Sequence, residues 1–141
     1  RQVASLLASL KFRNRGVGAF YLDQGFVAGI GNYLRSEILF FAKVNPWAKP
    51  NQLSTKELNQ LARATLDVSR RSYKTKGVTN EASRVTQLKK LGRTRSQFRH
   101  AVFGRESQAC YNCGSDILKD NVASRRLYWC PACQYETSER P

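Results

Sequence analysis

The sequence contains no methionine, a single histidine and only ten acidic residues against 24 lysines and arginines. No apolar run comes near the roughly 20 residues of a membrane span, and no secretory leader opens the chain. We therefore expect a protein of a reducing compartment that makes no membrane contact. The lack of methionine even at position 1 leads us to expect the C-terminal piece of a longer protein.

The shortage of acidic residues leaves a formal net charge of +14 on 141 residues. A chain this basic favours an anionic partner that offsets its self-repulsion, and nucleic acid is the obvious one. A basic helix on a membrane surface is the alternative, but no segment combines a long apolar face with a lysine-rich face. The length fits one modest domain, or a helical domain with a small appendage.

All four cysteines lie in the last quarter of the chain, as Cys110-Tyr-Asn-Cys113 and Cys130-Pro-Ala-Cys133 with sixteen residues between the pairs. Two C-x-x-C pairs at this spacing are typical of a structural zinc site with four thiolate ligands, so we expect one bound Zn²⁺. A disulfide module would spread its cysteines over the whole chain. A redox C-x-x-C would be expected in a βαβ context, which neither pair has.

Four segments show helical patterns. Residues 1–10 and 19–28 are two short ones, and apolar positions recur at helical spacing from Tyr33 to about Ala42. The clearest signal covers residues 55–72, where Ser54-Thr-Lys-Glu57 is a capping box placed just before an apolar stripe.

The apolar period fades after Val78, and residues 84–105 carry seven lysines or arginines and no acid. We expect residues 78–97 to be a solvated basic linker. Between the cysteine pairs, we expect two short strands, at residues 117–118 and 127–129. Residues 119–121 are of types that favour a turn between them. A hairpin this small needs bound metal to fold.

The segment Gly29-Ile-Gly31-Asn32 interrupts the helical pattern directly before residue 33. Two glycines and an asparagine at a helix start expose backbone N–H groups at the positive end of the helix dipole, which makes an anion site of phosphate size. Arg35, one turn later, would add a charged donor on the same side. The alternative is a turn between packed helices in which Asn32 only caps the helix, and the segment alone does not decide between the two.

Together, the glycine turn and the cysteine pairs resemble the C-terminal half of the bacterial formamidopyrimidine-DNA glycosylase and endonuclease VIII family. The similar stretches are residues 22–40, 72–77 and 110–134, in the family's order. The forms Gly-Asn-Tyr-Leu-Arg and Tyr-Trp-Cys-Pro-x-Cys-Gln are closer to endonuclease VIII than to its purine-directed relative.

The resemblance implies a mainly α fold, in which a helix-two-turn-helix domain precedes a small zinc-bound β-hairpin. The first domain would cover residues 1–97, with the basic linker at 78–97, and the zinc-finger module would cover residues 98–141. The partner implied is damaged duplex DNA.

The resemblance also assigns functional residues. Asn32, with Gly29 and Gly31 beside it, is similar to the family asparagine that holds the phosphates flanking the extruded nucleotide. Arg35 matches the arginine of the endonuclease VIII version of that helix. Arg125, five residues before the second cysteine pair, matches the hairpin arginine that contacts DNA phosphate at the lesion. The four cysteines match the family's zinc ligands.

Family chemistry begins with an N-terminal proline amine assisted by a glutamate, whereas this sequence starts with Arg1-Gln2. We therefore expect no catalytic residue in this fragment and a missing N-terminal catalytic domain. The parent would be a monomeric, cytoplasmic bacterial enzyme of base-excision repair, a bifunctional DNA glycosylase and lyase for oxidised bases, pyrimidines above all. The alternative is a non-catalytic zinc-ribbon module that binds nucleic acid in a transcription or ribosome-associated factor.

Four other residues invite functional interpretations that we do not favour. We expect Glu37 to be a surface carboxylate paired locally with Arg35, and His100 to belong to the basic surface. We expect Trp47 and Trp129 to pack in the core or on the hairpin rather than to stack on bases.

Overall fold

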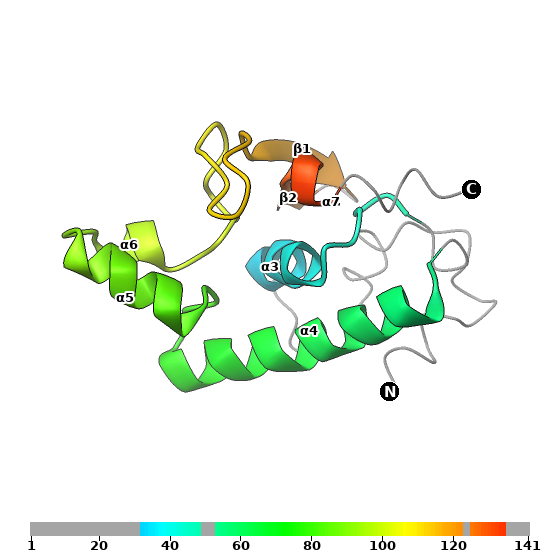
Figure 1. Cartoon of the computed structure of the whole chain (residues 1–141), viewed down its shortest axis with the longest axis horizontal. Helices are drawn as coiled ribbons and strands as arrows, with labels where there is room; N and C mark the ends of the chain where they lie inside the picture. The colour runs from blue at the N-terminus through cyan, green and yellow to red at the C-terminus, as the bar shows by residue number, and fades with distance from the viewer. Residues whose placement is uncertain (1–31, 49–52, 123–124, 135–141) are drawn as a thin grey trace.

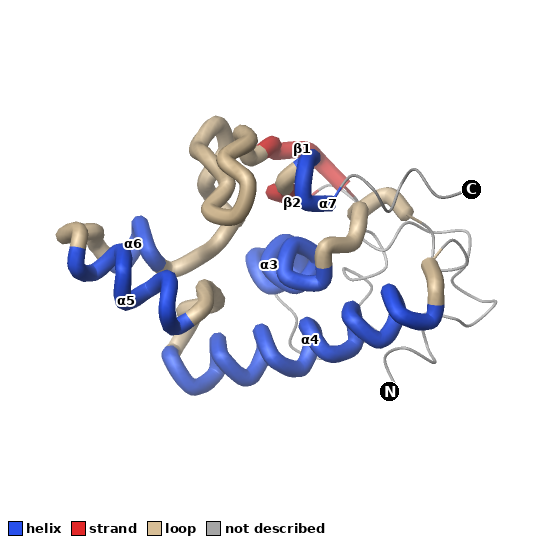
Figure 2. The backbone as a smooth tube through the Cα atoms, viewed as in Figure 1, coloured by secondary structure: helices blue, strands red, loops and turns tan. Residues whose placement is uncertain are grey.

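The computed structural model of this chain describes residues 32–48, 53–122 and 125–134. The elements of that part, in order, are α3 (Asn32–Ala42), α4 (Thr55–Thr75), α5 (Ala82–Lys90), α6 (Arg95–Phe98), β1 (Leu118–Val122), β2 (Arg125–Trp129) and α7 (Pro131–Gln134). The predicted fold class is confirmed, because helices dominate and a small two-stranded hairpin follows them (Figure 2). The helices predicted over residues 1–10 and 19–28, together with Gly29 and Gly31, lie outside the described residues.

Helix α3 is central to the described part, with α4 below it and the hairpin above it in Figure 1. Every residue from Leu34 to Phe40 is buried. Ile38 belongs to an apolar cluster shared with α4, whereas Phe40 belongs to a second cluster shared with the hairpin and the cysteine loops. A helix packed on both sides has little solvent face, so its polar residues at positions 35–37 must find partners inside the protein.

Helix α4 begins at the predicted capping box. Ser54 Oγ accepts the N–H of Glu57 at 3.1 Å, and the Glu57 carboxylate accepts the N–H of Ser54 at 2.8 Å. The apolar stripe that follows, which includes Val68, packs on α3. The helix continues three residues beyond the predicted end, to Thr75, and Lys76 terminates it in the left-handed conformation with φ of 59°.

The hairpin pairs β1 and β2 antiparallel, with Leu118 opposite Trp129 and Val122 opposite Arg125. The two strands confirm the prediction, but the turn predicted at residues 119–121 is wrong, because these residues lie inside β1. Their polar composition suggested a turn, yet Asp120 has a partner on the neighbouring strand. Its carboxylate accepts a hydrogen bond from the indole N–H of Trp129 at 2.8 Å.

Residues 78–97 are not an unstructured linker, as the sequence suggested, since they contain α5 and most of α6. The two helices form a small unit that projects beside the end of α4 (Figure 1). Val78, Leu88 and Phe98 make its buried cluster, with Val85 and Tyr111 packed against them. The predicted domain boundary after residue 97 falls inside α6, and the two-domain division stays a prediction. Among the described helices, none is long and apolar enough to cross a membrane.

Candidate metal site and nucleic-acid interface

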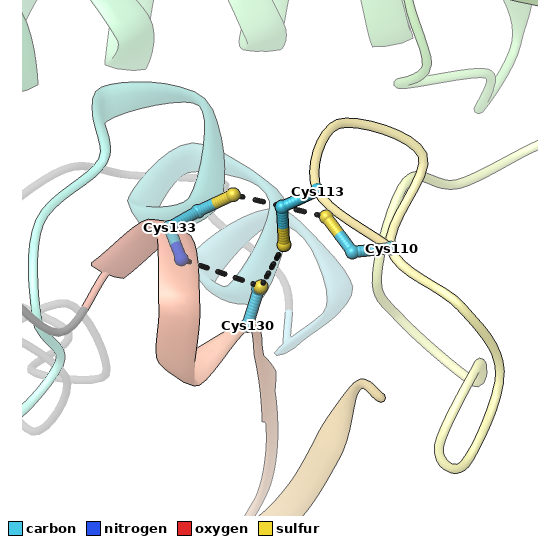
Figure 3. Close-up of side chains that lie close together, drawn as sticks. All are labelled: Cys110, Cys113, Cys130 and Cys133. Carbon is cyan, nitrogen blue, oxygen red and sulfur yellow. Dashed lines mark hydrogen bonds between the residues drawn. The ribbon is translucent and has the colours of Figure 1, made fainter. Parts of the chain in front are cut away.

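The four cysteines converge on one point from two separate loops. Cys110 and Cys113 come from the loop before β1, and Cys130 and Cys133 come from the end of β2 and the short helix α7 (Figure 3). All four Sγ atoms lie within 4.8 Å of one another. Cys110 Sγ is 3.8 Å from Cys133 Sγ, and Cys113 Sγ is 3.4 Å from Cys130 Sγ. These separations are far longer than a disulfide bond of about 2.05 Å, and all four thiols are free.

The spacing of the sulfurs fits one tetrahedral metal ion. Four sulfurs at about 2.3 Å from a central Zn²⁺ are about 3.8 Å from each other. Four soft thiolate ligands with no fifth position select zinc for a structural role rather than a catalytic one. The four cysteines thus form the site of one structural zinc ion, as the spacing of the pairs predicted.

The thiols of this cluster differ in pKa because their surroundings differ. Hydrogen bonding by Ser115 lowers the pKa of Cys113 to about 6. Burial raises the pKa of Cys130 to about 11 and also raises the pKa of Cys133. Without a cation between them, four thiolates would repel one another strongly, so zinc binding requires proton release and stabilises the folded loops.

Two residues that the sequence did not single out attach the metal site to the helices. Gln134 is fully buried, accepts the N–H of Cys130 at 2.9 Å and donates to the carbonyl of Val44 at 2.9 Å. Tyr111, between the first two cysteines, donates from its hydroxyl to the carbonyl of Gln97 in α6 at 3.4 Å. The metal site is therefore continuous with both α3 and the α5–α6 unit.

The first turn of α3 holds the hairpin by its outer edge. Arg35 is fully buried, and its Nη2 donates to the carbonyl of Arg126 at 2.9 Å. The next residue, Ser36, accepts the N–H of Tyr128 on its hydroxyl at 3.0 Å. These bonds satisfy backbone groups on the edge of β2 that β1 does not cover. The glycine-turn motif and the hairpin, about ninety residues apart in the sequence, are thus joined directly.

Glu37 is not the surface carboxylate that the sequence suggested, because it is fully buried. Its Oε1 accepts the N–H of Ala101 at 2.7 Å and the hydroxyl of Thr79 at 2.6 Å. Its Oε2 accepts the N–H groups of Val102 and Phe103 at 2.8 and 3.0 Å. One carboxylate thus orders the segment that leads from α6 to the first cysteine loop.

His100 is buried too, so the prediction of a place on the basic surface is wrong. Its Nδ1 lies 2.7 Å from Thr79 Oγ1, which donates its only proton to Glu37. The neutral ring must therefore carry its proton on Nδ1 and donate it to the threonine. Burial, with the charges of Arg99 and Arg95, lowers the pKa of His100 to about 4.

Of the predicted phosphate-binding residues, Asn32 begins α3 and Arg125 begins β2. The side chains of these two residues are outside what the structure describes. Trp47 and Trp129 pack against each other with ring centroids 4.9 Å apart, as expected for packing on the hairpin.

Sequence reasoning identified the metal ligands but missed the burial of Arg35, Glu37 and His100. A usable signal was present in α3, whose apolar residues Leu34, Ile38, Leu39 and Phe40 occupy more than one face. A helix buried all round implies that its polar residues have internal partners.

Known proteins resemble this chain in sequence over most of its length. Residues 1–84 match the family described as the formamidopyrimidine-DNA glycosylase H2TH domain. Endonuclease 8 of Salmonella arizonae is 44% identical over 133 residues, which are 94% of this chain and 47% of that protein. Endonuclease 8 of Klebsiella pneumoniae subsp. pneumoniae is 42% identical over 134 residues, which are 95% of this chain and 48% of that protein. The chain thus spans about half the length of these curated relatives.

Two solved structures share the fold. The MutM (Fpg) protein of Thermus thermophilus superposes with a TM-score of 0.74 at 31% identity, over 94% of this chain and 48% of that one. The formamidopyrimidine-DNA glycosylase of Lactococcus lactis, bound non-covalently to DNA containing an AP site, gives a TM-score of 0.73 at 26% identity, over 94% and 45% of the two chains.

Proposed function

This chain belongs to the formamidopyrimidine-DNA glycosylase H2TH family, and we propose that it is the DNA-binding part of a base-excision-repair enzyme similar to endonuclease 8. The whole enzyme would extrude an oxidised base from duplex DNA, remove it, and cleave the strand as a lyase. The 141 residues would hold the distorted duplex by its phosphates. A function on DNA also implies association with the nucleoid.

The observation that carries this proposal is the direct bond between the two motifs. Arg35 in the first turn of α3 donates to the carbonyl of Arg126, the residue after Arg125. The start of α3, where Asn32 lies, and the start of β2, where Arg125 lies, are therefore fixed relative to each other. Two phosphate-binding groups held at a set separation suit a backbone of fixed phosphate spacing better than they suit scattered anions.

We propose that Arg35 acts by holding the Arg126 carbonyl, and with it the start of β2, rather than by contacting DNA itself. Its full burial keeps the guanidinium away from water, and a buried charge serves best as a fixed anchor for a backbone carbonyl. Arg35 would thus be a positioning residue for Arg125, and Asn32 and Arg125 would contact the phosphates.

Zinc would supply rigidity rather than chemistry in this scheme. The four cysteines hold the base of the hairpin, Gln134 attaches that base to Val44, and α3 holds the outer edge of β2. The first residue of β2 is then carried on a strand fixed at both its far end and its side. Because β2 is already fixed in the free protein, less conformational entropy is lost when the chain binds DNA.

The test is binding of the 141-residue chain to duplex DNA over a range of salt concentrations. Because phosphate neutralisation releases counterions, the logarithm of affinity should fall linearly with the logarithm of salt, with a slope of about −0.9 per phosphate contacted. An affinity that is unchanged between low and physiological salt would contradict the proposal. A preference for ribosomal RNA over duplex DNA would favour the zinc-ribbon alternative.

The chemistry itself has a separate test. The chain spans about half the length of its endonuclease 8 relatives, so we expect the 141 residues alone to bind DNA without excising bases. Borohydride should trap little covalent complex with an abasic site. Robust trapping that disappears when a single lysine such as Lys74 is replaced would show that the chemistry lies within this chain.

A further inference from the structure

The segment from residue 82 to residue 105 has charge of one sign only. It contains no aspartate or glutamate and seven basic residues, namely Arg84, Lys89, Lys90, Arg93, Arg95, Arg99 and Arg105. Most of the segment is the α5–α6 unit, residues 82–98. No acidic side chain within the unit therefore offsets its positive charge.

Five of the seven basic residues contact other groups of the protein, Lys89 and Arg95 among them, and two do not. Arg84 and Arg105 lie over the Tyr111 ring at 5.0 and 3.8 Å, and Arg99 donates to the carbonyl of Gly77 at 2.8 Å. Arg84 thus holds the unit itself, and Arg99 and Arg105 hold the segment that follows it. Lys90 and Arg93, by contrast, are exposed, and within the described residues their side chains have no hydrogen bond, ion pair or ring contact.

The backbone that carries Lys90 and Arg93 is well defined. The N–H of Gly92 donates to the carbonyl of Lys89 at 3.0 Å, and the N–H of Arg93 donates to the carbonyl of Leu88 at 3.0 Å. This is the pair of bonds that ends a helix at a left-handed glycine, here Gly92 with φ of 80°. A capping box at Thr94 then starts α6 at once. The backbone of the turn is therefore ordered, and Lys90 and Arg93 extend from fixed positions on it.

The α5–α6 unit joins the protein at the start of α3. The Arg99 guanidinium lies 5.2 Å from the centre of the Tyr33 ring, and the His100 ring lies 5.0 Å from it. Tyr33 directly follows Asn32, so the unit is attached at the end of α3 where the proposed phosphate contact lies. Lys74 and Lys76, at the end of α4, are exposed and add positive charge nearby, since Arg95 donates to the carbonyl of Lys76.

We propose that the turn between α5 and α6, through Lys90 and Arg93, is a second contact for the sugar-phosphate backbone of duplex DNA, outside the phosphates held by Asn32 and Arg125. This inference rests on the proposed function. A duplex presents a regular row of phosphates, so a cationic turn attached beside one phosphate site faces further phosphates of the same molecule. An acidic protein is the less suitable partner, because Leu91 is the only large exposed apolar side chain that the described unit offers for an interface core.

The experiment compares two double variants of the 141-residue chain that lose the same charge. Lys90→Gln with Arg93→Gln alters the turn, and Lys56→Gln with Arg63→Gln alters exposed positions in the first half of α4. The α5–α6 unit lies beside the end of α4 (Figure 1). Because α4 has 21 residues, its start is about 30 Å from that end. Affinity for one duplex is measured at several salt concentrations, with melting curves to establish that both variants fold.

The turn variant should bind duplex DNA about tenfold more weakly at moderate salt and lower the salt slope by about one to two units. The α4 variant should stay close to the parent. Equal behaviour of the two variants, with the parent still binding DNA, would overturn this inference and leave the proposed function standing. Failure of the parent to bind DNA would overturn both.

Discussion

At the scale of single residues, the polar side chains of α3 determine how the parts of this protein meet. Glu37 is the strongest example, because one buried carboxylate accepts three backbone N–H groups and a hydroxyl from segments 42 to 66 residues away. Hydrogen bonds to a charged group contribute more than neutral ones, and a buried N–H that loses its acceptor is costly. The residue therefore fixes the segment between α6 and the first cysteine loop against α3.

Replacing Glu37 by Gln should lower the free energy of unfolding by about 2–4 kcal/mol, because the amide turns one acceptor into a donor that faces N–H groups. Denaturant unfolding of the zinc-bound chain measures this change. Glu81→Gln is the matched control, since Glu81 is exposed and its side chain makes no cap hydrogen bond. Similar losses of unfolding free energy in the two variants would show that the hydrogen bonds of the Glu37 carboxylate contribute little to stability.

His100 should make stability depend on pH in a defined direction. Its pKa is lowered to about 4 in the folded chain, from an ordinary value of 6.5, because burial disfavours the charged ring. The unfolded chain then binds the proton first as pH falls, so stability is full above about pH 6.5 and decreases down to about pH 4. The loss from this one group is up to about 3 kcal/mol.

The variant His100→Asn tests that assignment, because the asparagine amide can still donate to Thr79 but does not titrate. Parent and variant share any acid-induced loss of zinc, so the difference between their unfolding free energies isolates the histidine. That difference should change steadily between about pH 6.5 and pH 4. A constant difference over this range would contradict the pKa shift.

At the scale of elements, the zinc site and the α5–α6 unit should be coupled through Tyr111. This ring follows the first zinc ligand, packs on the cluster of Val78, Leu88 and Phe98, and lies beneath two arginines. Removing zinc with a chelator should therefore increase amide hydrogen exchange in residues 78–98 as well as in the hairpin. The first half of α4 should keep its protection. Unchanged exchange in residues 78–98 would show that the unit is independent of the metal.

The same elements show why some of the fold could be predicted from the sequence and some could not. The start of α4 and the metal ligands are encoded locally, in a capping box and in two C-x-x-C pairs. The α5–α6 unit is not, because its buried contacts come from Val78, Leu88, Phe98 and Tyr111, which are too far apart to make a periodic stripe. Burial of Arg35 and Glu37 was missed for the same reason, since their partners lie 42 to 91 residues away.

At the scale of the whole molecule, two hydrophobic clusters meet at α3, and most of the described lysines and arginines are exposed around them. The α4 cluster and the hairpin cluster share this helix, so the start of α3 and the start of β2 cannot move independently. The resemblance to the glycosylase family is confirmed. The proposal that goes with it is that Asn32 and Arg125 hold one DNA backbone together.

The most direct test measures DNA affinity, salt slope and thermal stability for Asn32→Ala, Arg125→Ala and the double variant. Each single change should weaken binding by about 1–3 kcal/mol, and the double variant should lose less than the sum because the two contacts depend on each other. Arg125→Ala should lower the salt slope by about one unit, whereas Asn32→Ala, which removes no charge, should leave it unchanged. The melting temperatures of all three variants should equal that of the parent. A loss of about 1 kcal/mol of stability in Asn32→Ala, as for a lost helix cap, with both single variants binding DNA like the parent, would contradict the role proposed for these two residues.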